Sequence, residues 1–467
     1  MLFSSIEFLY WFLPVVLVLY FAVPFRLKNY ILLAASLFFY FYGEKAYSVI
    51  MVGSILISYV SALLTDWFRG TKWSKFFLWL AVLVCLGLLG YFKYADFTIR
   101  NINGLLGTKI PLVGVALPIG ISFYTFQTLS YNIDVYRGTV AVQKNPCKLI
   151  TYVSLFPQLI AGPIVRYETV EAEISERKHS FEDFSSGVQR FVIGLSKKVL
   201  LANLLGELCD KFKALDEKTF VFYWIYAIAF SMHIYFDFSG YSDMAIGLGR
   251  VFGFHFLENF NYPYISKSIS EFWRRWHISL GTWFREYVYI PLGGNRVSTQ
   301  RWLLNIFVVW FLTGFWHGSE WNFILWGLYF GVLLALERIF LGKALDRLPA
   351  WSRHLYVLFF VVVSFVIFNA SGTTAMLRDL GGLFGAGVSG FVDTNTVYYL
   401  RSYAGVLVFG VIGVTPLAKT VVQKMKKSSL GAKVIDIATP VFILVMLLTA
   451  TAYLVDGSFN PFLYFRF

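Results

Sequence analysis

Charged residues are scarce in this sequence of 467 residues. Aspartate, glutamate, lysine and arginine make up 14% of it, against 58% hydrophobic residues. A soluble globular domain carries roughly a quarter charged residues, so the composition excludes that class of protein. The net charge is +13, but the basic residues lie in short segments between apolar runs. This placement indicates cytoplasmic loops and membrane lipid headgroups as their partners, and not nucleic acid.

Cysteine is also rare, and several catalytic motifs are missing. Cys85, Cys147 and Cys209 lie far apart without metal-ligand spacing, so we expect neither a disulfide framework nor a metal site. The sequence contains no Gly-x-Ser-x-Gly nucleophile elbow, no P-loop and no His-Glu-x-x-His motif. The corresponding serine hydrolases, nucleotide hydrolases and zinc proteases are therefore disfavoured.

Apolar runs near the length of a membrane span recur along the chain. Lipid offers no hydrogen-bond partners to an open sheet edge, so these runs must be helical, and no period-two alternation suggests a barrel. We predict an all-α polytopic membrane protein with about eleven transmembrane helices. The expected spans are 6–24, 29–43, 46–65, 75–95, 111–130, 219–239, 301–316, 320–340, 355–370, 401–416 and 435–455.

Two stretches interrupt this pattern. Residues 148–210 join short apolar pieces through breakers such as Gly162 and Pro163, which predicts re-entrant or interfacial helices packed against protein. Residues 240–300 mix arginine with tryptophan, as is typical of a cytoplasmic interface. Because no repeat of fixed period and no long linker separates the spans, we expect residues 1–467 to form a single membrane domain.

The expected orientation follows from lysine and arginine, which concentrate in cytoplasmic loops. Basic clusters lie at 26–28, 69–75 and 419–433, and we place all three inside. The N-terminus and the C-terminal tail, residues 458–467, are then extracytoplasmic. The first apolar run has no basic n-region and no small-residue cleavage site, so we interpret it as a retained helix instead of a signal peptide.

His317 is the first candidate catalytic residue among the six histidines. It lies between two strongly apolar segments, 302–315 and 321–336. An ionisable group at membrane depth costs about 2–3 kcal/mol, so such groups usually serve a function. A neutral imidazole can take a proton from a hydroxyl group, which makes His317 a general-base candidate. The structural alternative is a histidine that bonds a backbone carbonyl at a helix end.

His277 lies in a dense basic and aromatic segment and has two interpretations. Interfacial histidine and tryptophan are ordinary headgroup anchors. If the helices bring His277 and His317 into one cavity, however, His277 orients a substrate group or stabilises charge. The neighbouring Arg274, Arg275 and Trp276 are candidates for binding an anionic donor.

The other polar residues near the spans favour structural roles. His233 lies inside an apolar span and His255 just beyond it, and we expect each to donate one hydrogen bond inside the bundle. Asp237 and Asp243 lie near the end of the same span. They fit either helix caps, the commoner case, or a proton or cation site in a transporter.

Seven short motifs are spread over nearly the whole chain. They are PIGISFYTFQ at 118–127, FPQLIAGPI at 156–164, YFDFSGYSD at 235–243, FWRRWH at 272–277, YIPLGGNR at 289–296, WHG at 316–318 and NPFLYFRF at 460–467. Taken together they resemble the membrane-bound O-acyltransferase family, and specifically its bacterial branch that acetylates alginate and other exported polysaccharides.

The resemblance implies a helical bundle with a tunnel, in the bacterial cytoplasmic membrane. Acyl-CoA, here acetyl-CoA, would enter from the cytoplasm as a donor substrate and not as a permanently bound cofactor. His317 matches the catalytic histidine of the family and His277 its second signature histidine. Related systems pass the acyl group to a separate extracytoplasmic SGNH-type O-acetyltransferase, which is the expected partner.

The terminal motif implies a further candidate, Tyr464. Similar terminal motifs look like acyl carriers whose tyrosine hydroxyl accepts the acyl group. A phenol of pKa about 10 is a poor nucleophile until a base removes its proton, which a tunnel histidine would do. The alternative is an aromatic residue that anchors the tail at the membrane interface.

Two other functions remain open from the sequence. One is a D-alanyl transferase of the same fold, which takes its acyl group from a carrier-protein thioester. The other is an exporter of polysaccharide or lipid-linked sugar, although no pair of interrupted helices occupies corresponding halves of the chain. The acceptor polymer also stays open, with alginate, peptidoglycan and cellulose among the candidates.

Overall fold

The computed structural model describes residues 1–457 together with Phe462 and Leu463. The regular structure of this part of the chain is helical, without strands. It divides into two compact units: Met1–Phe191 with Ser242–Leu257, and Val192–Tyr241 with Glu258–Phe467. The all-α expectation is confirmed, whereas the single membrane domain stays a prediction.

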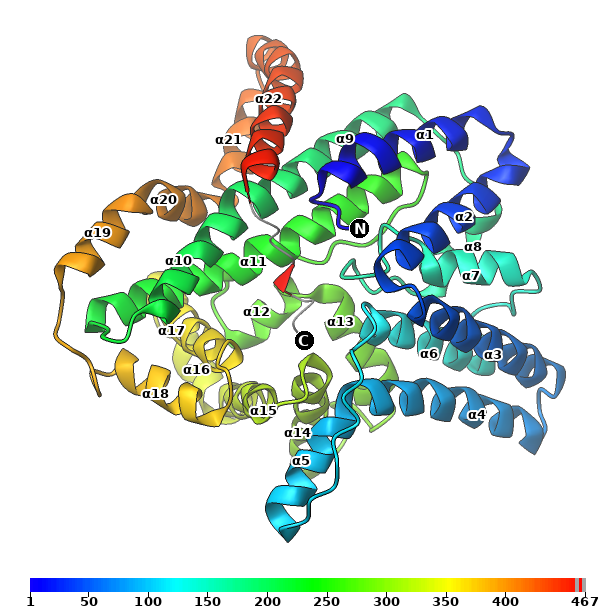
Figure 1. Cartoon of the computed structure of the whole chain (residues 1–467), viewed down its shortest axis with the longest axis horizontal. Coiled ribbons are helices and arrows are strands. Elements are labelled where there is room, and N and C mark those ends of the chain that lie inside the picture. The colour runs from blue at the N-terminus through cyan, green and yellow to red at the C-terminus, as the bar shows by residue number, and fades with distance from the viewer. Residues whose placement is uncertain (458–461, 464–467) are drawn as a thin grey trace. The chain divides into compact units, whose positions relative to one another are not determined.

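The first unit contains the N-terminal helices. α3 packs against α4, and both pack against α6, while α7 packs against α2 and α3 (Figure 1). Its helices are η1 (Phe8–Phe12), α1 (Leu13–Ala22), α2 (Phe25–Glu44), α3 (Tyr47–Trp67), α4 (Lys72–Leu89), η2 (Gly90–Tyr94), α5 (Ala95–Leu106), α6 (Ile121–Arg137), α7 (Pro146–Ser154) and α8 (Tyr167–Ser175). Two longer helices, α9 (Phe181–Ser196) and α11 (Phe220–Val251), contribute residues to both units.

The second unit contains the remaining helices and both candidate histidines. α14 packs closely on α15, and α15 packs on α17. Its helices are η3 (Lys197–Ala202), α10 (Asn203–Ala214), η4 (Pro263–Ile265), α12 (Ile269–Arg275), α13 (Ile278–Phe284), η5 (Arg285–Tyr289), α14 (Thr299–His317), α15 (Trp321–Leu336), η6 (Glu337–Leu341), α16 (Gly342–Leu345), α17 (Ala350–Phe368), α18 (Thr373–Leu383), α19 (Thr394–Ser402), α20 (Ala404–Gly413), α21 (Leu417–Met425) and α22 (Ser429–Asp456).

Six helical segments of the described chain are long and apolar enough to cross a membrane. A seventh is added if α19 and α20, which are bent by 57° at their junction, count as one span. Each overlaps a span expected from the sequence, so a multi-pass helical protein is confirmed. The six segments are Tyr47–Trp67, Lys72–Leu106, Phe220–Val251, Trp321–Leu345, Ala350–Phe368 and Ser429–Asp456.

The expected count of eleven spans is not reproduced. The segments expected at 6–24, 29–43 and 301–316 fall on helices outside this set. The segment expected at 111–130 is not one helix, because α6 begins only at Ile121. The buried side chains of α6 include serine, threonine, glutamine, asparagine and aspartate. This helix therefore packs against protein and not against lipid.

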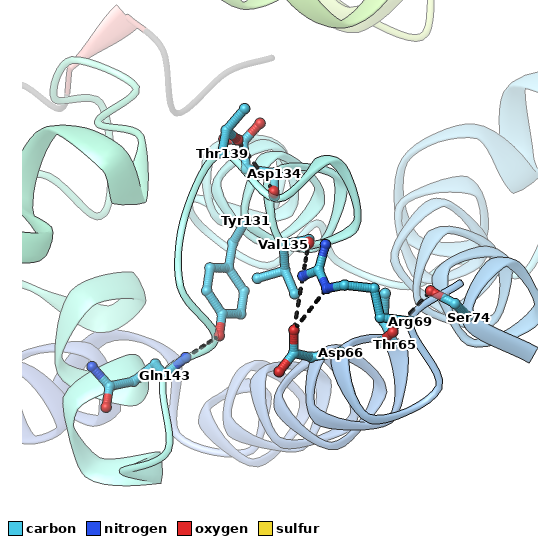
Figure 2. A network of polar contacts seen from close by, with 9 residues as sticks. All are labelled: Thr65, Asp66, Arg69, Ser74, Tyr131, Asp134, Val135, Thr139 and Gln143. Atoms are coloured by element: carbon cyan, nitrogen blue, oxygen red, sulfur yellow. Dashed lines mark hydrogen bonds and ion pairs between the residues drawn. The ribbon is translucent and has the colours of Figure 1, made fainter. Parts of the chain in front are cut away.

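The turn between α3 and α4 is tied to the end of α6 in the first unit (Figure 2). Nη2 of Arg69 donates to Oδ1 of Asp66 at 2.7 Å and to the carbonyl oxygen of Val135 at 2.9 Å. The hydroxyl of Ser74 donates to the carbonyl oxygen of Thr65 at 2.8 Å. A cation at the C-terminus of a helix bonds carbonyl groups that have no partner within the helix and interacts favourably with the helix dipole. Arg69 therefore fixes this junction.

Glycines allow α14 and α15 to pack closely in the second unit. A Cβ atom on Gly314 would lie 2.4 Å from the carbonyl oxygen of Phe323. One on Gly327 would lie 2.2 Å from that of Trp310. Close backbone approach through small residues is a common way to pack helices in a membrane. It fixes the position of His317, the last residue of α14.

Candidate functional site

The segment that carries His277 is positioned by a buried carboxylate. Glu337 accepts hydrogen bonds from the backbone N–H groups of Ile269 at 2.6 Å and Ser270 at 3.0 Å. These N–H groups open α12 and have no partner within the helix. Ser268 caps the same end, because its hydroxyl accepts from the N–H of Glu271 at 3.0 Å. α12 thus starts from a fixed point, and His277 follows two residues after it ends.

His277 has a left-handed backbone conformation, with φ 45° and ψ 53°. This conformation is uncommon for residues other than glycine and is often found at functional sites. Backbone hydrogen bonds on either side hold it. The N–H of Ile278 donates to the carbonyl oxygen of Asn259 at 2.9 Å. The N–H of Asn261 donates to the carbonyl oxygen of Arg275, also at 2.9 Å.

Asn259 also fixes the tautomer of the His277 ring. Its Oδ1 atom accepts from the backbone N–H of Ser279 at 3.2 Å, so this side of the amide must be the oxygen. The same oxygen lies 3.2 Å from Nδ1 of His277, which therefore carries the proton and donates. The lone pair is then on Nε2. Burial lowers the pKa of His277 to about 3, so the ring is neutral at physiological pH.

His317 lies at the end of α14 in an aromatic environment. Its ring is 5.1 Å from that of Trp326 and 5.4 Å from that of Phe368, both in edge-on geometry. Gly318 follows in an extended conformation, and a Cβ atom there would lie 2.2 Å from the ring of Phe323. Glycine is therefore required directly after the histidine.

The structure brings the two expected histidines together. The ring centroids of His277 and His317 are 6.5 Å apart and both side chains are buried. An imidazole nitrogen lies about 1.1 Å from its ring centre, so the ring nitrogens of the two residues are at least roughly 4 Å apart, too far for a direct hydrogen bond. The two rings therefore lie close together in the buried interior without bonding each other.

A cavity of about 470 Å³ adjoins His277. Arg274 and Arg285 contribute its cationic side chains, and both are exposed. Arg274 forms no ion pair within the described part of the chain. The other lining residues are Trp273, Ile278, Leu280, Gly281, Thr282, Phe284, Tyr289, Ile306, Val309, Trp310 and Thr313. Thr313 lies one helical turn before His317 on α14, so a mainly apolar cavity with two arginines leads towards the histidines.

The other expected donor-binding residues do not line this cavity. Arg275 donates from Nε to Glu271 at 2.9 Å and from Nη1 to the carbonyl oxygen of Asn261 at 3.1 Å. Trp276 is buried and stacks on Phe272 at 5.5 Å between ring centroids. Their role in donor binding stays a prediction. Tyr464 lies outside the described residues.

The remaining polar candidates take several structural roles. Nδ1 of His233 lies 2.6 Å from the carbonyl oxygen of Ala202, inside the second unit as expected. His255 is instead exposed, and its ring pairs with Glu173 at 2.8 Å, so its expected burial was wrong.

Asp237 and Asp243 do not cap helix ends. Both lie within α11, where Asp237 pairs with Lys198 at 2.6 Å and Asp243 with Arg190 at 2.9 Å. The expectation of helix caps was therefore wrong, because the helix continues beyond the predicted end of the span at residue 239. Asn259 and Glu337, which position His277, were missed because each bonds a segment far away in sequence.

Comparison with known proteins identifies the family of this chain. Residues 141–377 match the model of the membrane-bound O-acyltransferase family, and the chain belongs to that family. It is a multi-pass membrane O-acyltransferase. Among its relatives, a probable alginate O-acetylase of Azotobacter vinelandii is 37% identical over the whole of both chains, and one of Pseudomonas putida is 39% identical, also over the whole of both. A peptidoglycan O-acetyltransferase of Helicobacter pylori is 34% identical over 82% of this chain and 80% of its own.

Proposed function

We propose that this enzyme moves an acetyl group from cytoplasmic acetyl-CoA across the membrane for O-acetylation of an exported polysaccharide. The observation that carries the proposal is the pair of buried histidines, 6.5 Å apart, beside a cavity lined by Arg274 and Arg285. Its relatives include alginate O-acetylases and a peptidoglycan O-acetyltransferase, which supports alginate and peptidoglycan as candidate acceptors. The proposal includes the full set of about eleven spans in the bacterial cytoplasmic membrane.

The cavity suits an anionic thioester donor. Arginine binds phosphate through charge-assisted hydrogen bonds, and two exposed arginines at its edge would hold the phosphates of CoA. The apolar walls formed by residues such as Trp310 and Val309 would accept the less polar pantetheine arm. Arg274 is the residue predicted from the sequence, and Arg285 is a further candidate.

The chemistry proposed is transfer of acetyl from sulfur to oxygen. His317 takes the proton of the attacking hydroxyl, the oxygen attacks the thioester carbonyl, and the sulfur leaves and is protonated to give free CoA. His277, in the tautomer fixed by Asn259, offers a hydrogen-bond acceptor at Nε2. It therefore orients the hydroxyl instead of donating to the carbonyl oxygen.

The acceptor proposed for this step is the hydroxyl of Tyr464. An aryl acetate remains activated, so an extracytoplasmic SGNH-type O-acetyltransferase would take the acetyl group onto its serine and pass it to the polymer. Tyr464→Phe keeps the ring and removes the nucleophile. We expect it to stop polymer acetylation without changing protein abundance, and intact-protein mass spectrometry of the wild type to detect an acetyl adduct on the C-terminal peptide. Normal polymer acetylation by the variant would refute the carrier role.

The donor is tested by thioester turnover. Purified protein, together with its partner, should release free CoA from acetyl-CoA. Turnover of an acylated carrier protein, with none of acetyl-CoA, would favour the D-alanyl transferase. Absence of both activities, with transport of polymer, would favour the exporter.

The orientation proposed has both termini outside. A cysteine at position 426 should resist an impermeant extracytoplasmic thiol reagent, and one at position 458 should react. Cys147 is only partly buried, so both single cysteines are introduced into a variant that carries Cys147→Ser. The reverse labelling pattern would overturn this orientation.

A further inference from the structure

An ion pair without a role in the proposed chemistry is buried in the second unit. Nζ of Lys198, on η3, lies 2.6 Å from Oδ1 of Asp237, on α11. The side chains are 0% and 1% exposed. Removing two charges from water costs several kcal/mol per ion, and an apolar pair of similar size is often at least as stable. A buried pair in a membrane helix is therefore a candidate functional feature.

The second oxygen of the same carboxylate binds the C-terminal segment. Oδ2 of Asp237 accepts the backbone N–H of Leu463 at 2.7 Å. The ammonium group of Lys198 lies 4.6 Å from the ring centroid of Phe462, and the ring of Tyr241 meets that of Phe462 edge-on at 4.8 Å. Cation–π and edge-on aromatic contacts are both attractive. The ion pair thus holds two buried residues of the tail.

The backbone explains why Lys198 reaches Asp237. A Cβ atom on Gly240 would lie 2.8 Å from the carbonyl oxygen of Gly194 and 3.2 Å from the backbone nitrogen of Lys198. Only glycine permits this approach of α11 to the helical segment that carries Lys198. The approach lets the Asp237 carboxylate bond the lysine and still present an oxygen to the tail.

This docking site adjoins the turn of α11 that contacts His277. Phe238 follows Asp237 on α11, and its ring is 4.6 Å from that of His277. Successive residues of a helix point about 100° apart, so neighbouring faces of one helix turn serve the tail and the histidine site. Residue 464 follows Leu463 directly in the sequence.

We propose that Lys198, Asp237 and Tyr241 form a docking site that recognises the backbone and aromatic ring of the C-terminal tail and fixes its register beside the histidines. The proposal rests on the carrier function proposed for Tyr464, because register matters most when the next residue reacts. Lys198 and Asp237 are positioning residues, and no covalent bond changes at them. Recognition of a backbone N–H does not depend on whether the tail carries an acetyl group.

Amide hydrogen exchange of the full chain tests the docking site directly. The double variant Lys198→Met with Asp237→Leu removes both charges together, which spares the fold a single buried ion. We expect exchange of the Leu463 amide, resolved by overlapping C-terminal peptides, to accelerate by about tenfold or more. The matched control, Arg190→Met with Asp243→Leu, removes an ion pair that joins α9 to α11 and should leave the exchange unchanged. Unchanged exchange in the first variant would overturn the proposal.

Substitution of Leu463 tests the same hydrogen bond from the tail. Leu463→Pro removes the N–H group, whereas Leu463→Ala keeps it. We expect the proline variant to reduce polymer acetylation by about tenfold or more and the alanine variant by less than about threefold. Binding of acetyl-CoA should be unchanged in both. Equal activity of the two variants would contradict recognition through the N–H group.

The two measurements separate this proposal from the carrier function. If Tyr464→Phe acetylates polymer normally while the Lys198 and Asp237 double variant releases the Leu463 amide, the carrier role is wrong and the docking site stands as a structural anchor. If Tyr464→Phe is inactive while the amide stays protected in the double variant, the carrier role stands and the docking site is wrong. His317→Ala should leave the protection intact, because the docking site does not use that ring.

Discussion

His233 and His277 are both buried in the second unit, yet their surroundings differ. His233 bonds a backbone carbonyl, that of Ala202, and packs so closely against α10 that a Cβ atom on Gly206 would lie 2.7 Å from its ring. His277 bonds a side chain, that of Asn259, lines a cavity and faces a second histidine. Burial is common to both, so burial alone does not single out a candidate catalytic histidine. Access to a cavity and a defined tautomer distinguish the second region.

The largest expected effect comes from removing His317. His317→Ala should lower acyl transfer by about 100- to 10,000-fold, because that is the usual loss when a general base is removed. The measurement is CoA release by purified protein, with expression and membrane insertion compared by immunoblot. His354→Ala is the matched control, since His354 bonds the carbonyl oxygen of Ser266 at 3.0 Å and does not line the cavity. Transfer within threefold of wild type would exclude His317 as the base.

His277→Ala should impair transfer severely but incompletely, by about 10- to 100-fold, if the ring orients the hydroxyl. Asn259→Ala should reproduce part of this loss, because it removes the hydrogen bond that keeps the proton on Nδ1 of His277 while leaving the ring in place. Asn259→Asp, which keeps an acceptor for Nδ1, should retain more activity than the alanine variant. An unaffected rate in His277→Ala would show that this buried ring has a structural role only.

Arg274→Ala should raise the KM for acetyl-CoA by about tenfold with a smaller change in kcat, because it removes a charge-assisted hydrogen bond to phosphate. Arg275→Ala is the comparison. Its guanidinium is already bonded to Glu271 and Asn261, so we expect its KM to change by less than about threefold. Steady-state kinetics over a range of acetyl-CoA concentrations distinguishes the two. Equal changes in KM for the two variants would contradict a specific role of Arg274 in binding the donor.

His233→Asn should give the smallest change in activity per folded molecule, less than about twofold, because the ring touches no part of the cavity. It should lower stability by about 1–3 kcal/mol through the lost hydrogen bond and poorer packing against Gly206. Thermal unfolding in detergent and CoA release by the folded fraction measure the two quantities. A large loss of specific activity would remove the distinction between the two histidine regions.

Much of the fold was predictable from the sequence because the evidence is local. The apolar runs that correspond to α3, α11 and α22 can each be recognised within about twenty residues of sequence. The span predictions were wrong where polar side chains of a helix are buried against other helices. α6 is lined with buried polar groups and begins at Ile121, and α11 continues past Asp237 to Val251. Hydropathy cannot distinguish a helix buried in protein from one that faces lipid. In the apolar 18-residue stretch of α11, 72% of the residues are buried, whereas in that of α22 only 6% are.

The sequence by itself determined the membrane class and the helical fold, and it singled out the two candidate histidines. Apolar length and a costly ionisable group within an apolar region are properties of short segments, which are readable without a structure. Only the tertiary structure decided that Asn259 fixes the His277 tautomer, that Glu337 starts α12, and that Asp237 binds Leu463. These contacts join residues 18, 68 and 226 positions apart. Such partners leave no local pattern, because folding alone brings them within hydrogen-bond distance.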